Sequence, residues 1–555
     1  MHGASGTTAD GQTTTDCLLV GFNDGDFGSY VDMVRLMGAD SGAFQDLRLA
    51  FAEIDGRPHR ALDVLSRFHG DGRTHFHNSD FLWPVITYLG TFLHRAGLTF
   101  DYVNLFHLEK DALAAKLRAG DVRSVAVTTT LYVSPEPIIE VVSFVRRHAP
   151  DTQIIVGGPY VANQAKAMSA GDFEALLEYL GADVYVVGRE GELTLGRVCT
   201  ALRDGTPLDA VPNLAFRSPD GFTRTAEEVE SNPLPDNLVD YELFRDAFND
   251  FVTTRTAKSC PFSCAFCGFP KRAGKYTYLQ VRDVERELDA IASVGGVSTV
   301  TFIDDTFNVP KRRFREVLRM MIANGYGFRW NSFYRSDHGD RETIELMAEA
   351  GCEGVFLGVE SGSDRMLERM NKAARRADYV AALADFRDVG IATYASLIVG
   401  FPGETEETVA ETVSLLEEGR PDFFRAQLWY CDPVTPIFER REELQIQGDG
   451  FNWTHATMTS AEACAHIDRM FTGVRGSIWL PQFGFEQWST FYLQRRGMSL
   501  EQIKAFLVRF NALVAAQAIH PGTADEAALL DDLRAACAFD LQLPAKEAQR
   551  VAAAG

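Results

Sequence analysis

Three cysteines lie within eight residues of one another in the stretch KSCPFSCAFCGFP. Cys260, Cys264 and Cys267 have the spacing C-x3-C-x2-C, so their thiolates can converge on one metal centre without help from distant parts of the chain. A structural zinc site takes four protein ligands, whereas three thiolates favour an iron–sulfur cluster with one iron left open to a ligand. A catalytic zinc, a zinc knuckle completed by a distant histidine and chance spacing are the alternatives.

Composition sets limits on the kind of protein. With 555 residues, 46% of them hydrophobic and 24% charged, the chain predicts about three globular domains. Its net charge of −23 disfavours a nucleic-acid partner, because the phosphate backbone would be repelled. Nine cysteines in this length do not indicate a disulfide framework.

The sequence also predicts where the protein resides. No run of about 18 apolar residues is present, which argues against a membrane span. The first residues have neither the basic nor the apolar region of a signal peptide. We therefore expect a cytoplasmic protein with no membrane partner, in which residues 1–15 form a disordered tail.

Residues 16–231 alternate short apolar strands with amphipathic helices, which predicts a doubly wound parallel sheet. Ligands bind at the carboxyl ends of such strands. Two of the predicted strand ends carry small residues, Thr128-Thr129-Thr130 and Gly157-Gly158, which let a large ligand approach the backbone; ordinary turn glycines are the alternative. The expected strands are Cys17–Gly21, Phe100–Leu105, Ser124–Val127, Gln153–Val156 and Asp183–Val187.

After a predicted linker at residues 232–247, a second β/α pattern covers residues 248–445. Polar residues follow its apolar strands directly, as in a β/α barrel that builds its site from successive strand-end loops. These residues are Asp304 and Asp305, Glu360, and the stretch from Gly400 to Glu404. Residues 446–555 predict a mainly helical region, with capping boxes at Ser499…Gln502 and Thr523…Glu526.

The cysteine loop resembles the signature of the radical S-adenosylmethionine (SAM) superfamily. The resemblance implies a partial (β/α)6 barrel in which the three cysteines bind a [4Fe-4S] cluster, whose open iron chelates SAM and cleaves it to a 5′-deoxyadenosyl radical. It also implies that Asp304 and Asp305 contact the methionine amino group. Ribose and adenine contacts would come from Glu360, Ser396, Gly400 and Glu404. For Glu360 and Glu404 the alternative is a helix-start carboxylate that the helix dipole favours.

Residues 16–445 as a whole resemble the cobalamin-dependent (class B) branch of that superfamily. The stretches WPVITYLGTFLHRAG, SVAVTTT, IIVGGPYVAN and ADVYVVGREGE carry this resemblance. It implies that residues 128–130 and 157–158 line the nucleotide tail of cobalamin. The motif D-x-H-x-x-G is missing, so a histidine ligand to cobalt is not predicted. A degenerate sheet domain that has lost its corrinoid is the alternative.

The branch implies a methyltransferase of specialised metabolism, for example antibiotic biosynthesis. It would move a methyl group from SAM through methylcobalamin to an unactivated carbon. The segment FNDGDFGSYVDMVRLMG and the tract from Leu428 to Met458 are similar to the phosphinothricin-type P-methylases, which implies a phosphinate phosphorus as the other acceptor. The substrate would be a small molecule or a peptide, and an external donor such as flavodoxin or ferredoxin would supply electrons. A cyclase or rearrangement enzyme without net methylation, and a non-catalytic iron–sulfur or corrinoid carrier or sensor, are the rival readings.

Substrate contacts are expected from the polar and aromatic tract that runs from Leu428 to Met458, although packing against the barrel is the alternative for its aromatic residues. The candidates are Gln427, Tyr430, Thr435, Trp453, His455 and Thr457.

Overall fold

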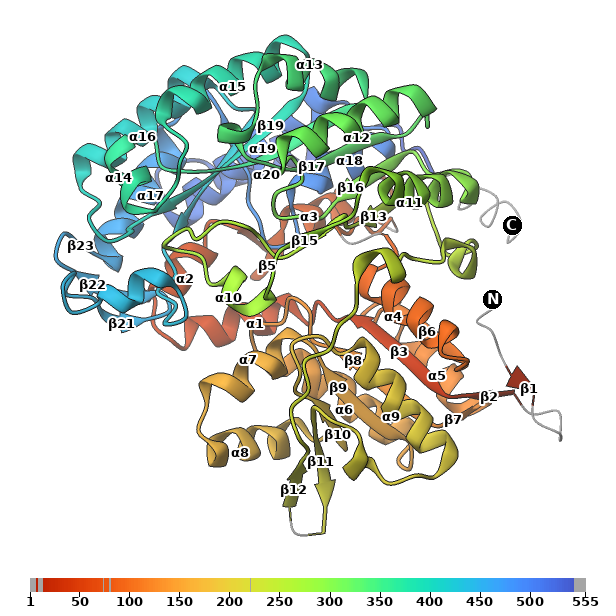
Figure 1. The fold of residues 1–555 in the computed structure, drawn as a ribbon. Coiled ribbons are helices and arrows are strands. Elements are labelled where there is room, and N and C mark those ends of the chain that lie inside the picture. Colours follow the sequence, from red (N-terminus) through yellow and green to blue (C-terminus); the bar gives the residue numbers. More distant parts are fainter. Residues whose placement is uncertain (1–5, 8–12, 73, 79–80, 220, 544–555) are drawn as a thin grey trace. The chain divides into compact units, whose positions relative to one another are not determined.

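The computed structural model describes residues 6–7, 13–72, 74–78, 81–219 and 221–543 (Figure 1). The chain forms two compact units. The first contains Met1–Asp26, Phe81–Phe248 and Asp289–Gly295; the second contains Phe27–Asp80, Asn249–Leu288 and Gly296–Gly555. Among the described helices, none has the length and apolar character needed to cross a membrane.

The first unit contains a seven-stranded sheet of order β12-β11-β10-β9-β8-β3-β6. Five neighbouring strands are parallel, and in chain order they stand 2-1-3-4-5 across the sheet. The order therefore reverses between β3 and β8, the topological switch point at which such sheets bind ligands. The parallel strands are β3 (Cys17–Phe22), β6 (Phe100–Leu105), β8 (Ser124–Thr128), β9 (Gln153–Gly157) and β10 (Val184–Val186). The predicted doubly wound sheet is confirmed.

Helices cover both faces of this sheet, which explains the nearly continuous apolar strands. Leu18, Val20 and Val125 are fully buried in its core. The helices are α4 (Pro84–Arg95), α5 (Lys110–Ala119), α6 (Glu136–His148), α7 (Pro159–Ala167), α8 (Ala170–Leu180) and α9 (Glu192–Asp204).

Two peripheral segments of this unit differ from the prediction. The expected linker at 232–247 is packed, because the ring of Phe244 lies 5.7 Å from that of Phe100 and 5.8 Å from that of Tyr102. In the expected tail, β1 (Gly6–Thr7) pairs with β2 (Thr13–Thr15), which joins β7 (Asp121–Val122). The rest of that tail, 1–5 and 8–12, lies outside the described residues.

An antiparallel hairpin, β11 (Leu214–Ser218) and β12 (Gly221–Arg224), forms one end of the seven-stranded sheet.

The second unit contains a parallel sheet of order β13-β16-β17-β18-β19-β20-β24. The predicted β/α barrel is confirmed, and it extends beyond residue 445 because β24 pairs with β20. The strands are β13 (Phe251–Thr254), β16 (Thr299–Phe302), β17 (Arg329–Tyr334), β18 (Cys352–Glu360), β19 (Ala392–Val399), β20 (Phe423–Leu428) and β24 (Ile478–Trp479).

Helices line the outer side of the barrel sheet (Figure 1). Residues of β18 such as Val355 and Leu357 are fully buried. The helices that alternate with the strands are α11 (Val281–Val294), α12 (Lys311–Asn324), α13 (Arg341–Glu349), α14 (Asp364–Arg369), α15 (Arg376–Asp388) and α16 (Glu406–Gly419).

Phe27–Asp80 belongs to the second unit, so the prediction that 16–231 form one domain is wrong for this segment. The reason is packing. Val31, Val34 and Leu47 form an apolar cluster to which Phe483 of the C-terminal region adds. Asp46 binds the fully buried Arg425 of β20 at 3.1 Å. The segment contains α1 (Phe27–Arg35), α2 (Gly42–Leu47), β4 (Phe51–Ile54), β5 (Arg57–Arg60) and α3 (Ala61–Phe68).

The region after the barrel is mainly helical, as predicted, with one small sheet. Its elements are β21 (Gln447–Asp449), β22 (Asn452–His455), β23 (Met458–Thr459), α17 (Ser460–Gly473), α18 (Gln487–Arg495), α19 (Leu500–Ala518) and α20 (Glu526–Ala536). The capping box of Ser499 and Gln502 is present. The predicted box at Thr523 is wrong, because Asp525 caps α20 and the Thr523 hydroxyl donates to the His520 carbonyl instead.

Candidate functional site

The cysteine loop leaves the barrel at the carboxyl end of β13. It starts after β14 (Ala257–Lys258), passes through α10 (Phe269–Ala273) and returns as β15 (Thr277–Tyr278), which pairs antiparallel with β14. The Ser259 hydroxyl donates to the carbonyl of Gly274 at 2.7 Å and closes the loop near its base. The loop is therefore anchored at both ends.

The three thiols sit in a partly desolvated environment. Cys264 is buried and Cys260 and Cys267 are half-buried. Burial raises the pKa of Cys260, and burial together with the two other thiols and Asp305 raises the pKa of Cys267 to about 11.

Asp304 binds the protein itself. It is 2% exposed, and its carboxylate accepts hydrogen bonds from the backbone N–H groups of Thr256 and Ala257, both at 2.7 Å, and from the Thr256 hydroxyl. Arg313, also buried, donates to the same hydroxyl at 2.7 Å. This geometry argues against the predicted contact between Asp304 and a ligand: the carboxylate positions the start of the cysteine loop.

Asp305, the next residue, is exposed. The surrounding protein desolvates its carboxyl group, and with the charge of Asp304 this raises its pKa to about 7. Asp305 also interacts electrostatically with Cys260 and Cys267. Of the two aspartates, only Asp305 is placed to meet a ligand beside the thiols.

Glu360 ends β18 at a register shift, with a left-handed φ of +64°. Its carboxylate forms a buried ion pair with Lys372 at 3.1 Å, and Lys372 also donates to the Gly358 carbonyl. The helix that follows starts only at Asp364. The alternative of a helix-start carboxylate therefore does not describe Glu360.

Glu404 is 1% exposed and accepts a hydrogen bond from the backbone N–H of Gly400. Burial raises its pKa to about 8. The following helix, α16, begins at Glu406 with Thr405 as its cap, so Glu404 precedes the first turn. It closes the loop 400–404 upon itself, while Ser396 is buried on β19.

Half of the predicted substrate contacts are buried by packing. Trp453 and His455 are buried, their rings stack at 5.1 Å, and His455 bonds the Gly400 carbonyl at 2.9 Å. The Thr457 hydroxyl accepts a hydrogen bond from Gly403. His455 and Thr457 therefore hold the loop 400–404 by hydrogen bonds to Gly400 and Gly403. Of the other candidates, Thr435 is buried, Gln427 is half-buried and Tyr430 is exposed.

In the first unit, residues 128–130 and 157–158 lie at the carboxyl ends of β8 and β9. Thr129 is fully buried and its hydroxyl donates to the Gly157 carbonyl at 3.0 Å. Gly158 has φ of +112°, and a Cβ there would lie 2.9 Å from the Thr129 hydroxyl oxygen. Thr129 and the glycines therefore join the two strand ends, which leaves the half-buried Thr128 and Thr130 to face a ligand.

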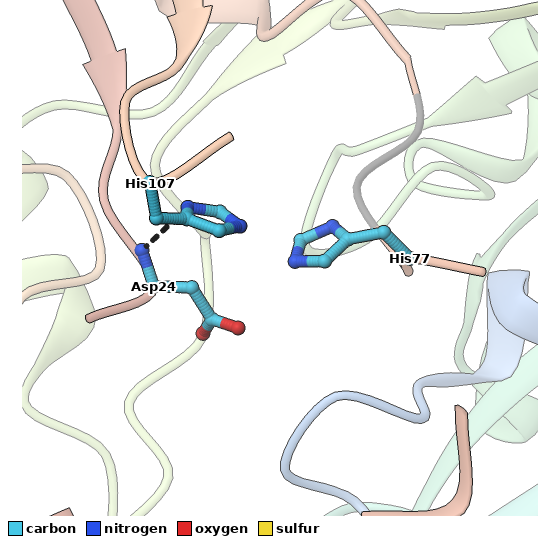
Figure 2. Close-up of side chains that lie close together, drawn as sticks. All are labelled: Asp24, His77 and His107. Carbon is cyan, nitrogen blue, oxygen red and sulfur yellow. Dashed lines mark hydrogen bonds between the residues drawn. The ribbon is translucent and has the colours of Figure 1, made fainter. Parts of the chain in front are cut away.

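The same edge has features that sequence reasoning missed. Leu108, Leu131 and Val133 are 54%, 66% and 84% exposed, and Leu131 has a left-handed φ of +69°. Figure 2 shows the backbone N–H of Asp24, just after β3, bonded to Nδ1 of His107 at 3.2 Å. His77, drawn in the same view, belongs to the second unit.

Beside the cysteines, sequence reasoning missed Arg335 and Lys372. Arg335 directly follows β17, and Asp304 is the second residue after β16. The strand itself was missed because RWNSFY mixes polar and aromatic residues. The available signal was that Trp330, Ser332 and Tyr334, at every second position, would share one face of a strand.

Residues 255–416 match the model of the radical SAM superfamily. This chain therefore carries a radical SAM domain, and the resemblance of the cysteine loop to that superfamily is confirmed.

Parts of the chain also resemble known proteins. It is 26% identical over 294 residues to the uncharacterized methyltransferase PH0819 of Pyrococcus horikoshii, covering 52% of this chain and 62% of that protein. It is 25% identical over 387 residues to the anaerobic magnesium-protoporphyrin IX monomethyl ester cyclase of Cereibacter sphaeroides, covering 66% and 61%. The chain thus spans about three fifths of the length of these relatives.

Among solved structures, the radical SAM methyltransferase TsrM of Kitasatospora setae with cobalamin and a [4Fe-4S] cluster bound is similar to this chain. The match has a TM-score of 0.58 and 17% identity, and it covers 98% of this chain and 100% of that one. At this identity the likeness concerns the fold alone.

Proposed function

We propose that the chain is a cobalamin-dependent radical SAM methyltransferase. It moves a methyl group from SAM through methylcobalamin to an unactivated carbon, or to a phosphinate phosphorus, of a small specialised metabolite or peptide. The observation that carries the proposal is the three-thiol loop, Cys260 to Cys267, anchored at the carboxyl edge of a parallel barrel sheet inside a radical SAM domain.

The residues at that edge fit SAM and a cluster. The three thiols supply three of four ligands, which leaves one iron for SAM. When bound, cluster and SAM together supply a carbon-centred radical. Asp305 offers a carboxylate acceptor for an ammonium group beside the thiols, and the ion pair of Glu360 and Lys372 offers polar atoms at the next strand end but one. Asp304 and Arg313 keep the loop in place for both ligands.

The carboxyl edge of the first unit fits a corrinoid. Its switch point lies between β3 and β8, where sheets of this order bind cofactors. The hydroxyls of Thr128 and Thr130, 3.1 Å apart, offer polar contacts, and the exposed Leu108, Leu131 and Val133 offer apolar surface to a large ligand. Apolar residues left exposed in this way are typical of binding surfaces.

The test is anaerobic reconstitution of the full chain with iron, sulfide and hydroxocobalamin, followed by a visible spectrum. We expect corrinoid bands beside a broad iron–sulfur shoulder. With a reductant such as flavodoxin, candidate metabolites and SAM labelled with deuterium in its methyl group, we expect 5′-deoxyadenosine and label in the product. A chain that binds neither iron nor corrinoid would overturn the proposal.

A cyclase without net methylation is the second candidate, favoured by the similarity to the anaerobic protoporphyrin ester cyclase. The same assay separates the two. A cyclase forms 5′-deoxyadenosine and a product free of deuterium, whereas a carrier or sensor forms neither compound.

A further inference from the structure

Arg335 lies against one of the three thiols. It directly follows β17, its side chain is 9% exposed, and its Nη1 lies 3.8 Å from Sγ of Cys264. This is a hydrogen-bond distance for a sulfur acceptor. Arginine cannot lose its proton in a protein, so the group beside the sulfur is permanently cationic.

Two side chains hold the guanidinium group in this orientation, and a third holds the backbone of Arg335. Nε and Nη2 donate to the two carboxylate oxygens of Asp337 at 3.0 and 2.8 Å. The ring of Phe262 lies 3.6 Å from Cζ. The fully buried Asn308 accepts a hydrogen bond from the backbone N–H of Arg335 and donates to its carbonyl. Because Nε and Nη2 of the planar guanidinium group are bound to Asp337, the remaining nitrogen, Nη1, is directed at the sulfur of Cys264.

The charges around the three thiols are unequal. Cys264 faces Arg335, and the buried Lys372 interacts with it electrostatically as well. Cys267 instead has the carboxylate of Asp305 as a neighbour, and Cys260 has both Asp305 and Arg335. Cys264 is the thiol that the Arg335 guanidinium group reaches within hydrogen-bond distance.

We propose that Arg335 is a positioning residue of the iron–sulfur cluster: it donates a charge-assisted hydrogen bond to the thiolate of Cys264 and raises the reduction potential of the cluster. Hydrogen bonds to the ligand sulfurs and nearby charge set such potentials. A reduced cluster carries one more negative charge, so a fixed cation at its ligand stabilises the reduced state. The inference rests on the proposed function in that the three thiols must hold the cluster.

The test is a redox titration of the reconstituted full chain, followed by electron paramagnetic resonance in the absence of SAM. At the potential where half of the wild-type cluster is reduced, we expect Arg335→Gln to lower the ratio of reduced to oxidised cluster about tenfold, which is about 59 mV for one electron. Arg335→Lys keeps the charge but loses the planar group that bonds both Asp337 and the sulfur, so we expect the ratio of reduced to oxidised cluster to fall less, by roughly threefold.

Arg272→Gln is the matched control. Arg272 lies in α10, close to Cys267 in sequence, and pairs with Asp432 at 2.5 Å. The Arg272→Gln variant loses the same charge as Arg335→Gln but removes no hydrogen bond to a sulfur. We expect its ratio to equal that of the wild type.

An unchanged ratio in Arg335→Gln, or an equal fall in Arg272→Gln, overturns the inference. If Arg335→Gln fails to retain iron, Arg335→Lys decides, and a ratio equal to the wild type then overturns it. A shift that arises only after SAM is added also overturns it, because Arg335 would then act through SAM. A wild-type chain that assembles no cluster rejects the proposed function instead.

Discussion

The carboxyl edges of the two sheets differ in chemistry. In the first unit the end of β8 is neutral, with Thr128 and Thr130 beside the exposed Leu131, while Asp24 and His107 follow the neighbouring strands. In the barrel the corresponding edge carries thiols and ionisable groups, among them Asp305 and the buried ion pair of Glu360 and Lys372. Both edges arise from the same alternation of strand and helix, so the difference lies in the residues that directly follow each strand.

The two edges also differ in what stabilises them. Asp304 and Arg335 are buried charges whose desolvation must be offset by several hydrogen bonds each. Thr129 and Gly158 hold their strand ends by neutral hydrogen bonds and close backbone approach. Substitutions at the barrel edge should therefore cost more than substitutions in the first unit.

The largest effect is expected from Cys264→Ala. We expect loss of most bound iron, and a fall in 5′-deoxyadenosine formation beyond the roughly 10–100-fold that residues around a metal ligand cost. Iron content and product are measured after anaerobic reconstitution. Cys464→Ala, which removes a buried thiol of α17 outside the loop, is the control and should retain its iron. Equal iron loss in both variants would contradict the assignment of the loop.

The adjacent aspartates allow a sharper comparison within the barrel edge. Asp304→Ala leaves Arg313 without its buried counter-charge, so we expect the free energy of unfolding to fall by about 3–5 kcal/mol. Asp305→Asn should not lower it, because a pKa raised to about 7 means that the folded protein disfavours the ionised carboxylate, but it should weaken SAM binding. Urea denaturation and SAM titration measure the two effects. A larger stability loss in Asp305→Asn would reverse the two assigned roles.

The raised pKa of Glu404 predicts that the free energy of unfolding depends on pH. Its pKa is raised to about 8 in the folded protein, so the folded state holds a proton that the unfolded state releases at lower pH. This contribution is fully present below pH 4.5 and is lost as the pH rises through 8. We expect Glu404→Gln, which stays neutral, to flatten the stability profile between these values and to gain about 2–4 kcal/mol on wild type at the upper end.

The comparison for Glu404 is a series of urea unfolding curves at pH 5 and pH 8. A parallel fall in wild type and variant would mean that Glu404 is ionised in the folded protein.

The smallest effects are expected in the first unit. Gly158→Ala places a Cβ 2.9 Å from the Thr129 hydroxyl at a left-handed φ, so we expect a loss of about 1–3 kcal/mol. Thr128→Val should change stability by no more than about 0.5 kcal/mol but weaken corrinoid binding, measured by the visible spectrum after gel filtration. A Thr128→Val variant that binds corrinoid like the wild type would remove Thr128 from the site.

Much of the fold was predictable, because strands that are buried on both faces are apolar along their whole length and can be recognised in the sequence. Phe100–Leu105 was placed to the residue. Among the barrel strands that were missed, β17 and β20 carry buried polar residues, of which Arg425 of β20 is one. The assignment of Phe27–Asp80 to the second unit was beyond prediction, because it depends on contacts with residues such as Arg425 and Phe483, far away in the chain.

The sequence by itself determined the thiol loop, because all three sulfur donors lie within eight residues and their convergence needs only local geometry. It also determined which residues follow the strands. Only the tertiary structure decided their roles: Asp304 faces the backbone and Asp305 the thiols, and Arg335 reaches Cys264 across 71 residues of chain. Such choices depend on which side chains burial and hydrogen bonding leave free, and these are set by neighbours distant in sequence.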